Sequence, residues 1–75
     1  MEFTFKLHLQ PEPDGGFTVL VPALPGCITH GDTFEEAVEM AQDAISLYIE
    51  ELKSQGIAII DDSNSIDYAL KLSVA

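Results

Sequence analysis

The feature that most constrains this sequence is a single apolar stripe at helical spacing between residues 33 and 56. Thr33 and Glu36 have the spacing of a capping box, in which each side chain binds a free backbone N–H at the start of a helix. Gly56 supplies a left-handed stop at the other end. The pattern therefore predicts one amphipathic helix between these limits. Its apolar stripe consists of Phe34, Ala37, Val38, Ala41, Ile45, Tyr48, Ile49 and Leu52.

Alternating apolar and polar residues flank the predicted helix on both sides, as in strands that bury one face. The pattern predicts strands at residues 2–10, 17–21, 27–30 and 66–74. The turn residues of PEPDGG join the first two strands into a hairpin, because Asp-Gly and the two prolines favour reversal of the chain. The apolar sides of the first, second and fourth strands consist of Phe3, Phe5, Leu7, Leu9, Phe17, Val19, Val21, Ile66, Tyr68, Leu70, Leu72 and Val74.

The order strand, strand, strand, helix, strand predicts an α+β fold, a β-β-β-α-β two-layer sandwich that spans residues 1–75 as a single domain. A right-handed helical crossover would return the fourth strand beside the first, which gives the sheet order 3-2-1-4 with one helix on one face. The other face carries Lys6, His8 and Leu20, and two strand edges stay open. We therefore expect this surface to be buried against another chain, most simply a second copy.

The charge balance limits the classes of partner. Thirteen carboxylates and three lysines give a net charge of -10, which repels nucleic acid and anionic lipid and makes a basic partner the natural complement. A hydrophobic content of 47% argues against disorder. The alternating N-terminus is unlike a signal peptide, no apolar run approaches the roughly 18 residues of a membrane span, and a lone cysteine forms no internal disulfide. We expect a cytoplasmic protein with no membrane association.

The segment VPALPGCITHGDTFEEA, residues 21–37, contains the residues that most resemble a catalytic site. Cys27 and His30 could act as nucleophile and base, but the acid-rich surroundings would raise a thiol pKa, so we favour a half-buried apolar cysteine. Oxygen ligands for a metal could come from Asp32, Glu35, Glu36 and Glu39, although their spacing matches no known metal loop. We interpret the segment as a connector.

The exterior of the predicted helix is strongly acidic. Glu36, Glu39, Asp43 and Glu50 lie on one flank of this exterior. A solvated helix face is one reading of these charges. The other is a docking surface, on which the carboxylates would bind the cationic groups of a basic nucleic-acid-binding protein and occupy the surface meant for phosphates.

Two longer stretches, GGFTVLVPALPGCITHGDTFEEA and AQDAISLYIEELKSQG, contain three motifs in unbroken order. These are V-P-x-L-P-G-C, G-D-T-x-E-E-A and A-x-x-A-I-x-x-Y-I-E-x-L-x-x-x-G. With the preceding hairpin they cover residues 3–56, and through them the sequence resembles the HicB antitoxin family. The resemblance implies a truncated ribonuclease-H-like fold, homodimers or homotetramers, and binding to HicA, a small basic RNA-cleaving toxin.

Two departures from the family pattern shape the expected function. Many relatives carry a C-terminal DNA-binding domain, whereas this chain ends at Ala75, so we expect the short form without direct nucleic acid binding. Active ribonuclease-H enzymes place an acid within strand one, and residues 3–10 contain none, so we expect no nuclease activity, catalytic residue, metal or cofactor.

The leading hypothesis is a non-enzymatic, homo-oligomeric antitoxin of a type II toxin-antitoxin system that neutralises a HicA-type toxin. The expected contacts are Glu36, Glu39, Asp43 and Glu50. Because the family includes solitary members, an oligomeric regulatory or structural module without a toxin is an alternative. A further alternative is a small metal-dependent nuclease or hydrolase that uses Asp14, Asp32 or Asp61 with His30.

Overall fold

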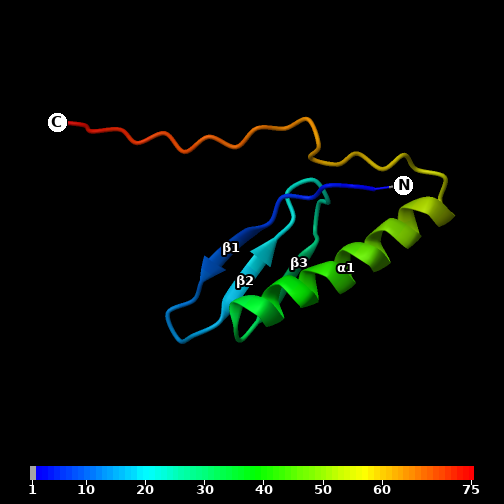
Figure 1. The fold of residues 1–75 in the computed structure, drawn as a ribbon, viewed down its shortest axis with the longest axis horizontal. Coiled ribbons are helices and arrows are strands. Elements are labelled where there is room, and N and C mark those ends of the chain that lie inside the picture. The colour runs from blue at the N-terminus through cyan, green and yellow to red at the C-terminus, as the bar shows by residue number, and fades with distance from the viewer. Residues whose placement is uncertain (1) are drawn as a thin grey trace.

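The computed structural model describes residues 2–75 and arranges three strands and one helix in two layers (Figure 1). The strands β1 (His8–Pro11), β2 (Phe17–Leu20) and β3 (Ile28–Gly31) form an antiparallel sheet in the order β1-β2-β3. The helix α1 (Phe34–Ser54) lies across one face and packs chiefly on β3 and β2. The predicted α+β class, the hairpin and the single helix on one face are confirmed.

The centre of the core lies between β2 and the first half of α1. Val19 pairs with Leu9 on β1 and with Thr29 on β3, and its side chain is completely buried. Ala37 and Ala41 are also fully buried and pack on Val19 from the helix. Because alanine side chains are small, the helix can approach the sheet closely at this point.

The connector between β2 and β3 forms a second part of the core. The Val21 N–H donates to the Cys27 carbonyl (3.1 Å), and the Leu24 N–H donates to the Val21 carbonyl (3.0 Å). These three side chains form a buried apolar cluster, onto which Tyr48 packs from the helix. The Tyr48 hydroxyl donates to the Pro25 carbonyl (2.8 Å). The segment connects β2 to β3, and its apolar residues also join the sheet to the helix.

Both predicted helix ends are confirmed. The Glu36 N–H donates to Thr33 Oγ1 (3.1 Å), and Glu36 Oε1 accepts a hydrogen bond from the Asp32 N–H (3.2 Å). At the other end Gly56 has φ +70°, and the Ile57 N–H donates to the Leu52 carbonyl (2.9 Å). This arrangement satisfies carbonyls that would otherwise be free at the end of a helix.

The first strand is shorter than predicted, because the backbone of residues 4–6 binds side chains from the C-terminal part of the chain. The Thr4 N–H donates to Asp61 Oδ2 (2.8 Å), and the Lys6 N–H donates to Asp62 Oδ2 (2.8 Å). Strand pairing therefore begins only at His8. The prediction for the second strand differs from β2 by one residue at its end, and the prediction for the third differs from β3 by one residue at each boundary.

The predicted fourth strand, and with it the sheet order 3-2-1-4 within one chain, is wrong for this structure. Residues 57–75 form no strand, and the sheet stops at β1. Residues 66–74 are extended but run away from the sheet (Figure 1, orange to red). The physical reason is that alternation specifies an extended backbone with one apolar side, and does not specify the strand with which that backbone pairs.

We predict that Gly31→Ala strongly destabilises the fold. A Cβ atom at this position would overlap the backbone N and Cα of Ala37, so β3 and α1 would have to move apart. Overpacking against backbone atoms should reduce the free energy of unfolding by about 3 kcal/mol, measured by urea denaturation. The neighbouring control His30→Ala removes an exposed side chain and should cost less than about 1 kcal/mol. Equal stability of the two variants would contradict the assigned packing.

A second prediction concerns the attachment of residues 61–62 in acid. The hydrogen bond from the Thr4 N–H, with a smaller contribution from Ser63, lowers the pKa of Asp61. A carboxyl with a lowered pKa stabilises the attached state above its usual pKa, and this contribution is lost as the pH falls through the lowered value. The amide resonance of Thr4 should therefore shift on acidification below about pH 4. Asp61→Asn should abolish this titration, and a Thr4 resonance that is insensitive to acid in the unaltered chain would disprove the attachment.

Candidate protein-binding surface

The four predicted contact residues lie together on the side of α1 that faces away from the sheet. With 3.6 residues per turn, Glu36, Glu39, Asp43 and Glu50 fall within a sector of about 60° and extend over about 21 Å of the helix axis. All four are exposed. The buried Ala37 and Ala41 occupy the opposite side of the helix. Packing of α1 on the sheet therefore turns these carboxylates toward solvent.

The charge of this surface is not neutralised by the ion pairs within residues 2–75. Lys6 Nζ lies 3.7 Å from Asp67 Oδ2, and His30 Nε2 lies 3.9 Å from Asp32 Oδ1. Neither pair includes a member of the acidic surface. Glu36 also takes part in the helix cap, so its carboxylate has a structural role as well. The surface is thus strongly anionic, as a basic partner would require.

Two exposed apolar residues that were not among the predicted contacts lie beside these carboxylates along the helix. Met40 is 42% exposed and Leu47 is 67% exposed. Met40 stands four residues after Glu36 and three before Asp43, and Leu47 stands in the same relation to Asp43 and Glu50, so all of them share one helix face. The spacing in the sequence therefore already indicates that Met40 and Leu47 lie on the acidic face. We call the combined surface the α1 outer face: Glu36, Glu39, Met40, Asp43, Leu47 and Glu50.

Phe34 is a correction to the predicted core stripe. Its side chain is 56% exposed, although it makes an edge-on contact with the ring of Phe17 at a centroid distance of 6.1 Å. Phe34 is the first residue of α1. The helical period therefore gives the direction of this side chain, and its position at the end of the helix determines its exposure.

The structure does not bring Cys27 and His30 together as a catalytic pair. Cys27 is buried with Val21 and Leu24, and burial raises the pKa of its thiol. The side chain of His30 is exposed and lies beside Asp32. Since residues three apart in an extended segment point to opposite faces, the two groups are directed away from one another.

The alternative hydrolytic residues are also distributed over separate parts of the molecule. Asp14 belongs to the hairpin loop, Asp32 lies beside His30, and Asp61 binds the backbone of Thr4. Across residues 2–75 no group of three histidine, cysteine or acidic side chains is placed to hold a metal ion. Within the same residues, no helix has the length and apolar character needed to cross a membrane.

A small α+β domain with an uncompensated acidic and apolar helix face has the features of a protein-binding module. Residues 5–73 match the family model described as the HicB-like antitoxin of a bacterial toxin-antitoxin system. Because this match covers most of the chain, the protein belongs to that family. The resemblance found in the sequence motifs is confirmed.

Individual relatives agree with this assignment. The chain is 46% identical over 50 residues to UPF0150 protein ssr1765 of Synechocystis, which covers 67% of this chain and 63% of that protein. It is 46% identical over 59 residues to UPF0150 protein Ta0767 of Thermoplasma acidophilum, covering 79% of this chain and 86% of the relative. It is 34% identical over 77 aligned positions to Antitoxin HicB of Escherichia coli K12, covering 95% of this chain but 54% of that protein.

The environment of Cys27 yields a prediction about thiol reactivity. Burial both shields the sulfur and disfavours the thiolate, which is the reactive form. At pH 8 the folded protein should react with a disulfide reagent about 100-fold more slowly than free cysteine, and addition of denaturing urea should restore the ordinary rate. A folded-state rate equal to that of free cysteine would contradict a structural role and favour a reactive one.

Proposed function

We propose that this protein is the antitoxin of a type II toxin-antitoxin system and that it neutralises a small basic mRNA-cleaving toxin of the HicA type. Membership of the HicB-like antitoxin family supports a toxin as the partner in general terms. The observation that carries the proposal is the α1 outer face, because its carboxylates form a row without internal cations. The identification of the toxin as a HicA-type protein rests on the resemblance to relatives named Antitoxin HicB.

Neutralisation would proceed by competition for the RNA-binding surface of the toxin. A ribonuclease that binds RNA presents lysine and arginine side chains to the phosphates. Carboxylates on α1 would form charge-assisted hydrogen bonds with the same groups, while Met40 and Leu47 would exclude water at the centre of the contact. The net charge of -10 would accelerate the encounter, with an effect that declines as salt is added.

The remaining features of the proposal follow from the same reading. The protein would act without enzymatic activity or a cofactor, in the cytoplasm, as a homodimer or homotetramer. The proposal includes a truncated ribonuclease-H-like topology. A solitary oligomeric module is the second candidate. The exposed apolar residues of the C-terminal segment support self-association, which is common to both candidates.

The test is a triple variant of the α1 outer face, Glu39→Gln, Asp43→Asn and Glu50→Gln, which leaves the capping residue Glu36 intact. Its affinity for the basic ribonuclease encoded beside its own gene should fall at least about 100-fold, measured by calorimetry, because three charged contacts are removed. The triple variant should also fail to rescue the growth of cells that express the toxin. Circular dichroism should remain unchanged, since these side chains are exposed.

The matched control carries Glu2→Gln, Glu12→Gln and Asp14→Asn, which remove the same charge outside α1. This control should lose less than about tenfold in affinity, through weaker long-range attraction alone. Equal losses in the two triple variants would refute the assigned surface. Absence of any binding by the unaltered protein would refute the toxin partner and support the solitary module.

A further inference from the structure

The C-terminal segment, residues 66–74, has every property of a β-strand except a partner. One of its two sides is a row of exposed apolar side chains. The segment contains neither proline nor glycine, so each backbone N–H is available for pairing. Such a row is unfavourable in water and marks a surface that becomes buried. The members of the row and their exposed fractions are Ile66 90%, Tyr68 83%, Leu70 69%, Leu72 74% and Val74 88%.

The outer edge of β1 is a free acceptor for a strand. Before β1 begins, the N–H groups of Thr4 and Lys6 are already bound by Asp61 and Asp62 of the same chain, so the free part of the edge is that of β1 itself. Within β1 the register, with the Val21 N–H bonded to the Cys27 carbonyl, turns the N–H groups of His8 and Gln10 toward β2. The N–H of Leu9 therefore points to the outer edge, on the same side as Pro11. Within residues 2–75 the sheet ends at β1, so no strand pairs with this edge.

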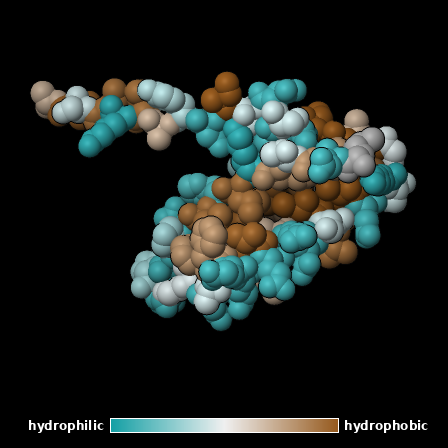
Figure 2. Space-filling view, viewed as in Figure 1, coloured by the Kyte–Doolittle hydropathy of each residue, from teal (hydrophilic) through white to brown (hydrophobic). Residues whose placement is uncertain are grey.

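An apolar groove lies beside the residues that lead into β1. It has a volume of about 240 Å³ and is lined by Phe5, Leu7, Val38, Gln42, Ile45 and Ser46. It stays open because α1 packs chiefly on β3 and β2 rather than over β1. Figure 2 shows the apolar side chains as a continuous brown band on this face. A strand added beside β1 would direct one row of side chains into this groove.

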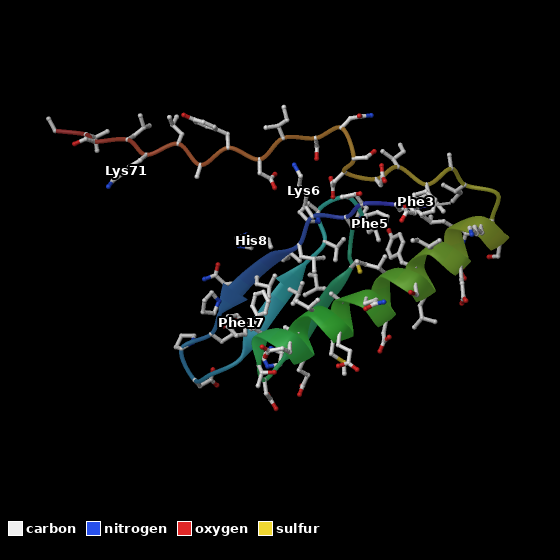
Figure 3. The ribbon with its side chains drawn as sticks, viewed as in Figure 1. Phe3, Phe5, Lys6, His8, Phe17 and Lys71 are labelled. Atoms are coloured by element: carbon white, nitrogen blue, oxygen red, sulfur yellow. The ribbon has the colours of Figure 1, made fainter. Side chains whose placement is uncertain are left out.

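The direction of the C-terminal segment keeps it away from the groove of its own chain. The Ser65 N–H donates to the Asp62 carbonyl (3.1 Å), and Lys6 Nζ donates to the Ser65 carbonyl, so a turn is held at the beginning of the β1 edge. Figure 3 shows Lys6 on the side of β1 toward the C-terminal segment, and Lys6 also pairs with Asp67. Beyond this point the segment extends outward and contributes to a long axis of 50 Å, against 28 and 19 Å for the others.

We propose that residues 66–74 form a strand that each chain donates to a second copy, where it pairs with the free edge of β1 and places its apolar row in the groove. The position beside β1 in the order 3-2-1-4 is then filled by the partner chain. Exchange in both directions gives a two-fold dimer in which each copy donates and accepts one strand. This inference goes beyond the proposed function, and it does not depend on the existence of a toxin.

The first experiment compares two double variants of the full chain by sedimentation equilibrium, without any toxin. Leu70→Asp with Leu72→Asp places charge on the apolar side of the segment and should raise the dissociation constant of the dimer at least about 100-fold. The control, Ala69→Asp with Ser73→Asp, places the same charge on the opposite side and should raise it less than about tenfold. The unaltered chain should be a dimer at tens of micromolar.

The second experiment separates exchange from docking within one chain. A chain that ends at Ser65 can accept a strand but has none to donate, and should be monomeric alone. Leu9→Pro in the full chain removes an N–H from the outer edge of β1, on the side where Pro11 already lies, and leaves the donor segment intact. Mixing the two chains should give a heterodimer with one exchanged strand, detected by native mass spectrometry. The helical circular dichroism of each chain is recorded first, and mixing the truncated chain with the unaltered one repeats the test without the proline.

Several results would overturn the inference. A monomeric unaltered chain at 100 micromolar would do so, as would a dimer that is unaffected by the two aspartates on the apolar side. If the truncated chain forms no heterodimer with either full-length chain, the segment docks within its own chain and exchange is wrong. Since no toxin is present in these measurements, their failure would leave the role of the α1 outer face to be judged separately.

Discussion

The close approach of α1 to the sheet is the contact on which the rest of this structure depends. It requires a residue without a side chain at Gly31, where any Cβ would overlap the backbone of Ala37, and small side chains at Ala37 and Ala41 over the buried Val19. Since the helix has 3.6 residues per turn, fixing this side against the sheet fixes the opposite side toward solvent. The arrangement of Glu39, Asp43 and Glu50 on one exposed face follows from packing on the other side of the same helix.

The same packing also leaves the sheet incompletely covered. One helix placed over β3 and β2 provides little cover for β1, and the residues beside that strand line an open groove with Val38 and Ile45. A domain of this size has few residues with which to close such a gap, because it buries only about 60% of the surface that its unfolded chain would expose. Burial against another chain is the remaining way to remove this apolar surface from water. The proposed self-association would meet this need, which arises from the fold's size and helix placement.

Local features of this molecule could be predicted from the sequence, whereas features set by distant contacts could not. The capping box at Thr33, the stop at Gly56 and the hairpin depend on neighbouring residues, and all are present. The length of the first strand depends on Asp61 and Asp62, more than fifty residues away, whose carboxylates bind the backbone at Thr4 and Lys6. Alternation in residues 66–74 predicted extended backbone correctly but carried no information about its partner. For the candidate surface, helical spacing groups the acidic residues and places Met40 and Leu47 with them, while the exposure of these two side chains comes from the packing of the helix.

The two proposed contacts use neighbouring parts of α1 and respond to charge in opposite ways. The groove adjoins the acidic face. Of its helical lining, Val38 and Ile45 lie about 100° or more around the helix from Glu39, whereas Gln42 and Ser46 lie within about 60° of it. A strand-exchanged pair would therefore leave Asp43 and Glu50 free, with Glu39 nearest the exchanged strand. Two copies that each carry a net charge of -10 repel one another, and salt screens this repulsion. Attraction of a basic toxin is screened by the same ions. Added salt should therefore strengthen the association of two copies and weaken the binding of the toxin, because apolar burial drives the first contact and opposite charge drives the second.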